Sequence, residues 1–183
     1  MTGQPPGEKR APRTQFRATE YLVDFGAGPV SARIHTNADG TPGGLVADTA
    51  EAEDTVHIDR DARVFGNARV FGSSRIEGKA KVHDNARIHD SVIAGQADIS
   101  GNATVEDATV EGLARVSGDV RIGNGALIGG RATVRGAAKV LGDAVIDGDA
   151  VVEDTAWVAG GHITGATVIG GSTTVRNGEV HGL

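Results

Sequence analysis

Two histidines of this chain each stand directly before an aspartate, as His83–Asp84 and His89–Asp90. An imidazole beside a carboxylate can take a proton from a hydroxyl or an amine, which is the role of a general base. Both histidines are therefore candidate catalytic residues. The alternative is that each histidine merely occupies an outward position on a repeating surface. Which of the two interpretations applies depends on the secondary structure that holds the histidines.

Basic residues are concentrated between residues 58 and 87, where seven of them accompany only four acidic residues. The seven are Arg60, Arg63, Arg69, Arg75, Lys79, Lys81 and Arg87. One interpretation is an anion site for phosphate, coenzyme A or a sugar nucleotide, with Arg63, Arg69, Lys81 and Arg87 as the cofactor contacts. The other is a solvated belt that forms ion pairs with nearby acids. We favour the belt, because the repeat described below places successive members on different faces.

Composition narrows the possible functions. The chain has 183 residues, a formal net charge of −6 and no cysteine. This charge predicts no binding to nucleic acid or to an anionic membrane, and the missing cysteines exclude disulfides and thiolate metal sites. No metal site is expected. The first residues, MTGQPPGEKRAPRTQ, contain no apolar run, so we expect no secretory signal and a cytoplasmic location.

An aliphatic residue recurs at intervals of six from Ile58 to Val180. A few steps are five residues long, and one, from Val168 to Val175, is seven. Six residues make about 1.67 turns of an α-helix, so a helix would scatter these side chains around its axis. A strand, in contrast, alternates its two faces every two residues. In Ala62-Arg63-Val64 it would bury the first and third residues and expose the arginine.

Each short strand is followed by residues that suit a corner. Glycine, asparagine and aspartate tolerate a positive φ better than other residues, and they occur together at Gly66-Asn67, Asp84-Asn85, Gly101-Asn102 and Gly148-Asp149. Three strands and three corners use about 18 residues and close one coil, which pairs with the next as a parallel ladder about 4.8 Å away. The pattern predicts an all-β, single-stranded parallel β-helix, a triangular prism of about seven coils.

Taking every third repeat assigns the outward residues to faces. One face carries Arg63 and Lys81 before the aliphatic position and His83 after it, and a second carries Arg69, Arg87 and His89. The two histidines then cannot line one site within a single chain. The third face carries Val92, Leu127 and Val145. We interpret these three as an apolar stripe at a subunit interface, since such stripes commonly mark one.

The part of the chain before the repeats differs in character. Residues 1–15 are rich in proline, glycine and charge, and we expect a disordered tail. QFRATEYLVDF and PVSARIHT alternate well enough to be two strands joined around Gly26-Ala27-Gly28. The predicted organisation is therefore a tail over residues 1–15, a β-rich cap over 16–57 and the β-helix over 58–183.

The repeats ARVFGN, ADISGN, ARVSGD and AVIDGD resemble the hexapeptide repeat of left-handed β-helix proteins, in which acyl- and acetyltransferases predominate. The resemblance covers about residues 58–180, and the tandem GNARV-type form is most similar to uncharacterised bacterial and phage β-helical proteins. It implies a left-handed coil, whereas the usual crossover rule favours the right-handed one. It also implies trimers with parallel prisms and, in the enzymes, a histidine base that activates the acyl acceptor.

Two functions follow as expectations. The first is a non-catalytic scaffold or binding module that self-associates as a trimer through the third face and requires no cofactor. It is favoured because the repeats run without the extruded loop, the GNPA-like segment or the C-terminal helix usual in the acetyltransferases. The alternative is an acyltransferase that uses acetyl-CoA or CoA, with His83 or His89 as the general base.

Overall fold

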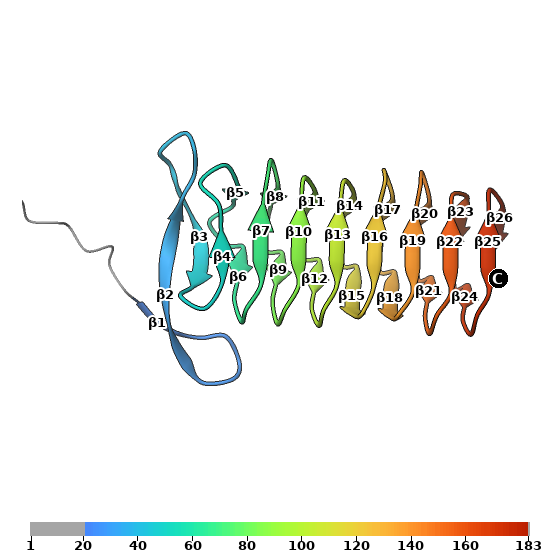
Figure 1. The fold of residues 1–183 in the computed structure, drawn as a ribbon, viewed down its shortest axis with the longest axis horizontal. Coiled ribbons are helices and arrows are strands. Elements are labelled where there is room, and N and C mark those ends of the chain that lie inside the picture. Colours follow the sequence, from blue (N-terminus) through green and yellow to red (C-terminus); the bar gives the residue numbers. More distant parts are fainter. Residues whose placement is uncertain (1–20, 183) are drawn as a thin grey trace, which may run out of the picture.

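The computed structural model describes residues 21–182, and over this range the chain is all-β, without helices. Its strands form a parallel β-solenoid of about eight turns. The turns follow one another along the long axis, from an N-terminal hairpin at one end to the C-terminus at the other (Figure 1). The prediction of about seven coils is short by one, because β3 and β4 precede Ile58, where the counted repeats begin.

Three sheets run along the rod, here named A, B and C. Sheet A, in spatial order, consists of β1 (Tyr21–Asp24), β2 (Pro29–Thr36), β3 (Pro42–Ala47), β6 (Arg63–Val64), β9 (Lys81–Val82), β12 (Asp98–Ile99), β15 (Arg115–Gly118), β18 (Thr133–Gly136), β21 (Val151–Val152) and β24 (Val168–Ile169). Sheet B consists of β4 (Glu51–Ala52), β7 (Arg69–Phe71), β10 (Arg87–His89), β13 (Thr104–Glu106), β16 (Arg121–Gly123), β19 (Lys139–Leu141), β22 (Trp157–Ala159) and β25 (Thr174–Arg176). Sheet C consists of β5 (His57–Ile58), β8 (Arg75–Ile76), β11 (Val92–Ile93), β14 (Thr109–Val110), β17 (Leu127–Ile128), β20 (Val145–Ile146), β23 (His162–Thr164) and β26 (Glu179–His181).

Each strand of the solenoid pairs in parallel with the strand three positions later, so equivalent residues stack turn upon turn. Val64 pairs with Val82, Val82 with Ile99 and Ile99 with Val116, and all four are fully buried. Small residues two positions earlier, such as Ala62, are buried beside them, as the alternation predicts. The core is therefore a stack of branched aliphatic side chains, which suit a pleated surface buried on one face.

The irregular steps of the repeat have a simple structural explanation. The five-residue step from Ile88 to Ile93 lies at the corner between sheets B and C, where Asp90 turns with positive φ. The seven-residue step does not exist. Val168 is 60% exposed, while its neighbour Ile169 is buried and pairs with Val152. The predicted inward position of Val168 is therefore wrong, and Ile169 restores the six-residue interval.

The predicted corners are confirmed. Gly66, Asp84, Gly101 and Gly148 all have positive φ, between 59° and 70°. Gly101 shows why glycine is used where turns stack. A Cβ built there would lie 2.6 Å from the backbone nitrogen of Gly118 in the next turn.

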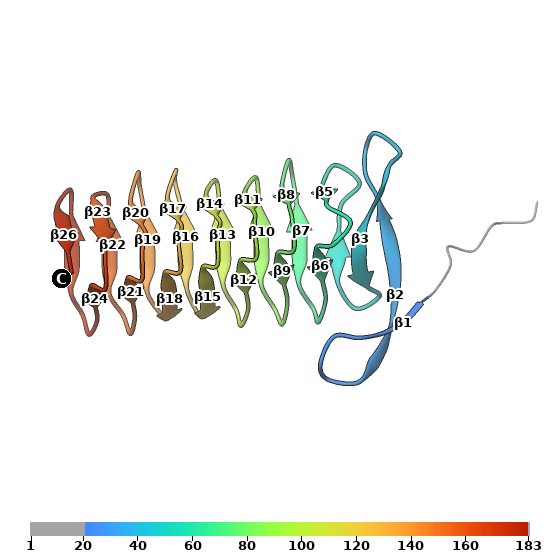
Figure 2. The same ribbon diagram turned by 180° about the vertical axis from the view of Figure 1, so that it is seen from behind.

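An antiparallel hairpin lies at the N-terminal end of the rod (Figure 2). β1 pairs with β2, as the sequence predicts for residues 21–24 and 29–36, and β2 pairs with β3. β3 then pairs in parallel with β6, so it is both the last strand of this cap and the first of the solenoid. The predicted disordered tail over residues 1–15 lies outside the described residues, as do residues 16–20 of the predicted cap.

Candidate functional site

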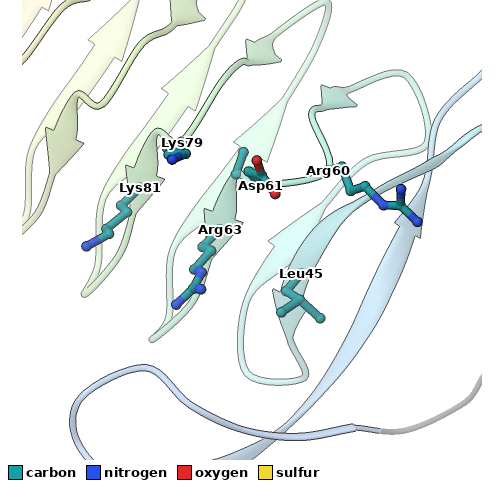
Figure 3. A pocket seen from close by; sticks show the side chains of 7 residues that line it. Leu45, Arg60, Asp61, Arg63, Lys79 and Lys81 are labelled. Carbon is teal, nitrogen blue, oxygen red and sulfur yellow. The ribbon is translucent and has the colours of Figure 1, made fainter.

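Four of the seven clustered cations line one open pocket, here called the basic pocket. Its side chains are Arg60, Arg63, Lys79 and Lys81, together with Leu45, Asp61 and Ala62, around a volume of about 540 Å³ (Figure 3). All four cations are exposed, which is compatible with the solvated belt predicted from the sequence. Cations from different repeats line one pocket where the corner between sheets C and A meets sheet A, with Arg60 extending away from the other three (Figure 3).

The register explains why these cations share one pocket. β6 pairs with β9, which places Arg63 directly beside Lys81 on the outer surface of sheet A. Arg60 and Lys79 lie in the two corners that lead into these strands. Figure 3 shows Arg63 and Lys81 extending side by side from neighbouring strands. Stacked corners thus add two cations to the two that the strands supply.

The other two predicted cofactor contacts lie elsewhere. Arg69 and Arg87 are neighbours on sheet B, where β7 pairs with β10. Arg69 also faces Glu51 of the preceding turn, with its Nε 3.5 Å from the carboxylate. Arg75 pairs with Glu77 at 2.6 Å. The predicted ion pairs are confirmed for these two arginines, and the four predicted cofactor contacts divide into two pairs on different sheets.

His83 lies on the outer surface of sheet A, held between two carboxylates. Its Nε2 lies 2.8 Å from Asp98 Oδ1, and its Nδ1 lies 3.2 Å from Asp84 Oδ1. The hydrogen bond to Asp98 is the main cause that raises the pKa of His83, and the same bond lowers the pKa of Asp98. The protonated ring can donate to both carboxylates at once. Carboxylates of the protein thus lie at both ring nitrogens, an arrangement that does not favour His83 as a general base.

Aromatic rings connect His83 to the N-terminal hairpin. The ring of Phe25, in the turn between β1 and β2, stacks on Phe65 with centroids 4.7 Å apart. Phe65 stacks in turn on His83, also at 4.7 Å and nearly parallel. A cation over an aromatic face is electrostatically favourable. The stack therefore attaches the hairpin to the second and third turns of the solenoid through Phe65 and His83.

His89 has a different environment on sheet B. Its ring is tilted against Phe71 at 6.0 Å, and its Nδ1 lies 3.3 Å from Asp90 Oδ2. Its side chain is 46% exposed, against 22% for His83. The two histidines lie on different sheets, as the six-residue spacing predicts, and they do not share a site. Within residues 21–182, no group of three or more histidine, cysteine or carboxylate side chains could hold a metal ion.

Two buried polar residues that the sequence did not reveal cover the first strand of sheet C. Asn37 accepts a hydrogen bond from the Ile58 backbone nitrogen at 2.9 Å and donates to its carbonyl at 3.4 Å. His35 Nε2 lies 2.9 Å from the Val56 carbonyl. Both side chains come from β2 and the turn that follows it, and both are about 5% exposed. Both residues precede the six-residue repeat, so its pattern of inward and outward positions does not include them.

The predicted apolar stripe lies on sheet C, with one difference. Leu127 and Val145 are adjacent rungs, but Thr109 stands between Val92 and Leu127. The three apolar side chains are half-buried rather than fully exposed. The four rungs from Val92 to Val145 form an uncharged row on the outer surface, here called the sheet C row.

Comparison with known proteins supports the repeat and its fold. The YdcK beta solenoid repeat matches residues 62–78 and 97–112. Each matched segment covers one full turn, β6 to β8 in the first and β12 to β14 in the second. The search of curated proteins found no match. No helix within the described range is long and apolar enough to cross a membrane. The matched repeat and the three parallel ladders identify the chain as a β-solenoid repeat protein.

Proposed function

We propose that this chain is a non-catalytic scaffold or binding module that self-associates as a trimer. The observation that carries the proposal is the unbroken coil. From β4 to β26 no connection between strands exceeds four residues. Corners this short extend no loop over the surface, so a single chain has no wall behind which reacting groups could be shielded from water, as catalytic sites commonly require.

The sheet C row supports self-association. Val92, Thr109, Leu127 and Val145 occupy four successive rungs without a charge. On the other sheets the equivalent rungs carry charges, such as Arg115 on sheet A and Arg121 on sheet B. The interior of a protein interface is depleted in charged residues, so sheet C is the face best suited to pack against copies of itself.

Analytical ultracentrifugation of the full chain tests this proposal. We expect a species of about three times the 18.6 kDa chain mass, and we expect Leu127→Lys to dissociate it by placing a charge in the interface. Thr133→Lys adds the same charge at an outward position of sheet A, in the strand that directly follows Leu127, and should leave the trimer intact. A wild-type protein that sediments as a monomer at all concentrations would refute self-association.

The structure gives less support to the acyltransferase alternative. His83 has carboxylates at both ring nitrogens, and His89 lies on a different sheet from the basic pocket. The discriminating experiment is acetyl-CoA turnover with a panel of hydroxyl and amine acceptors. Turnover that is abolished by His83→Gln or His89→Gln would replace the scaffold proposal with the enzyme. No turnover by the wild-type chain supports the scaffold.

A further inference from the structure

We propose that the basic pocket is a binding site for an oligophosphate anion. Four cationic side chains, Arg60, Arg63, Lys79 and Lys81, line it, against a single carboxylate, that of Asp61. They gather at one end of a chain whose net charge is −6. Like charges brought together repel one another, so an unoccupied cluster of this kind is unfavourable and an anion relieves it.

The cations of the pocket are not neutralised by the protein. None of the four forms an ion pair with any carboxylate of residues 21–182. The nearby acids hydrogen-bond to other groups, although Lys81 is among the charges that lower the pKa of Asp98. Asp59 accepts hydrogen bonds from the Gly78 backbone nitrogen and from His57, and Asp98 binds His83. The pocket therefore keeps an excess of positive charge.

A second pocket farther along the same corner provides an internal comparison. It is lined by Arg115 and Arg131, together with Leu113, Thr133 and Asp149. Here Arg131 forms an ion pair with Asp149, with its Nε 3.0 Å from the carboxylate. A carboxylate of the protein thus occupies the place that an external anion could take. In the basic pocket the carboxylate among the lining residues is that of Asp61, and within residues 21–182 it forms no ion pair with the four cations.

The lining also indicates the class of anion. Its only apolar side chains are Leu45 and Ala62, and no aromatic ring is among the lining residues, so a nucleobase would find no stacking surface. Arg63 and Lys81 are one rung apart, a spacing of about 4.8 Å. Arginine binds phosphate oxygens through two parallel hydrogen bonds, and lysine acts as a point charge. This set recognises several linked phosphates rather than a base or a sugar.

Isothermal titration of the full chain with tripolyphosphate at low salt tests the site. We expect saturable binding, and we expect Arg63→Gln/Lys81→Gln to weaken it by about tenfold or more through loss of two charge-assisted contacts. The matched control is Arg69→Gln/Arg87→Gln, which removes the same charge from sheet B and should change affinity by less than about twofold. Equal weakening by both double variants, or no saturable binding, would overturn the proposal.

Two further ligands test which chemical group the basic pocket recognises. Coenzyme A presents phosphates together with a nucleoside, and hexaglutamate presents carboxylates. We expect neither to bind more tightly than tripolyphosphate, and we expect hexaglutamate to bind more weakly. If coenzyme A bound about tenfold more tightly than tripolyphosphate, the nucleotide would be what the site recognises. If hexaglutamate bound as tightly as tripolyphosphate, binding would reflect non-specific electrostatic attraction. Either result overturns the oligophosphate assignment without affecting the trimer proposal, which is read by sedimentation.

Discussion

Replacing Asp98 by asparagine removes the carboxylate that holds His83 while keeping the size of the side chain. His83 Nε2 lies 2.8 Å from Asp98 Oδ1, and this bond is the main cause of the raised pKa of His83. We therefore expect the pKa of His83 to fall in Asp98→Asn. Asp84 still lies 3.2 Å from Nδ1, so part of the upward shift should persist.

The cost in stability depends on how far water screens the pair. A hydrogen bond between charged groups contributes about 1.5–3 kcal/mol to the free energy of unfolding. The side chains of His83 and Asp98 are 22% and 39% exposed, and screening of exposed pairs reduces the expected loss to about 1 kcal/mol. This is enough to measure by chemical denaturation.

The loss should depend on pH with a defined sign. The pKa of His83 is raised above 6.5 in the folded state, so its contribution is fully present below pH 6.5 and lost as the pH rises through the folded value. The pKa of Asp98 is lowered below 3.8, so its contribution is present above pH 3.8 and lost as the pH falls through the folded value. The pair should therefore stabilise the fold most between these two pH values.

Two measurements test this reasoning. NMR titration of the His83 ring should give a lower midpoint in Asp98→Asn, whereas Asp149→Asn, which removes a carboxylate paired with Arg131, should leave that midpoint unchanged. Urea unfolding should separate wild type from Asp98→Asn by about 1 kcal/mol at pH 5.5 and by less at pH 9. An unchanged midpoint, or the same difference at both pH values, would refute the role assigned to Asp98.

Three further substitutions test the fold by urea unfolding followed by circular dichroism. Ile122→Ala removes a side chain that is 1% exposed and should cost about 2–5 kcal/mol through loss of burial and a cavity; a loss below 1 kcal/mol would contradict its core position. Gly101→Ala should cost about 1–3 kcal/mol more than Gly171→Ala, because both have positive φ but only Gly101 faces the next turn; equal losses would refute the steric argument. Asn37→Ala should cost about 1–3 kcal/mol, since it leaves the buried amide of Ile58 without a partner; stability equal to wild type would show that water replaces it.

The candidate site illustrates what a one-dimensional pattern can and cannot predict. The repeat correctly placed Arg63 and Lys81 on one face, since strand residues recur at fixed intervals and their partners follow from counting. It did not predict that Arg60 and Lys79 would join them, because corner residues have no alternating face. Their direction depends on the backbone turn and on how successive corners stack.

For the two histidines, too, the repeat pattern predicted the face that each occupies but not all of its contacts. The spacing of His83 and His89 was enough to separate them onto different sheets. The partner of His83 was predicted as Asp84, its neighbour in sequence. The structure adds the closer contact with Asp98, which comes from the next turn and lies beside Lys81 in the register. To predict a contact between two turns, the exact number of residues in each turn must be known.

From its sequence alone this chain is determined to be all-β and coiled, because aliphatic residues six apart can be buried together only by short strands that turn at regular corners. Tertiary structure alone decides which of two adjacent aliphatic residues points inward, as at Val168 and Ile169. It also decides how Asn37 covers the first edge of sheet C and which cations share one pocket. These features depend on pairing between turns, which local preference does not encode.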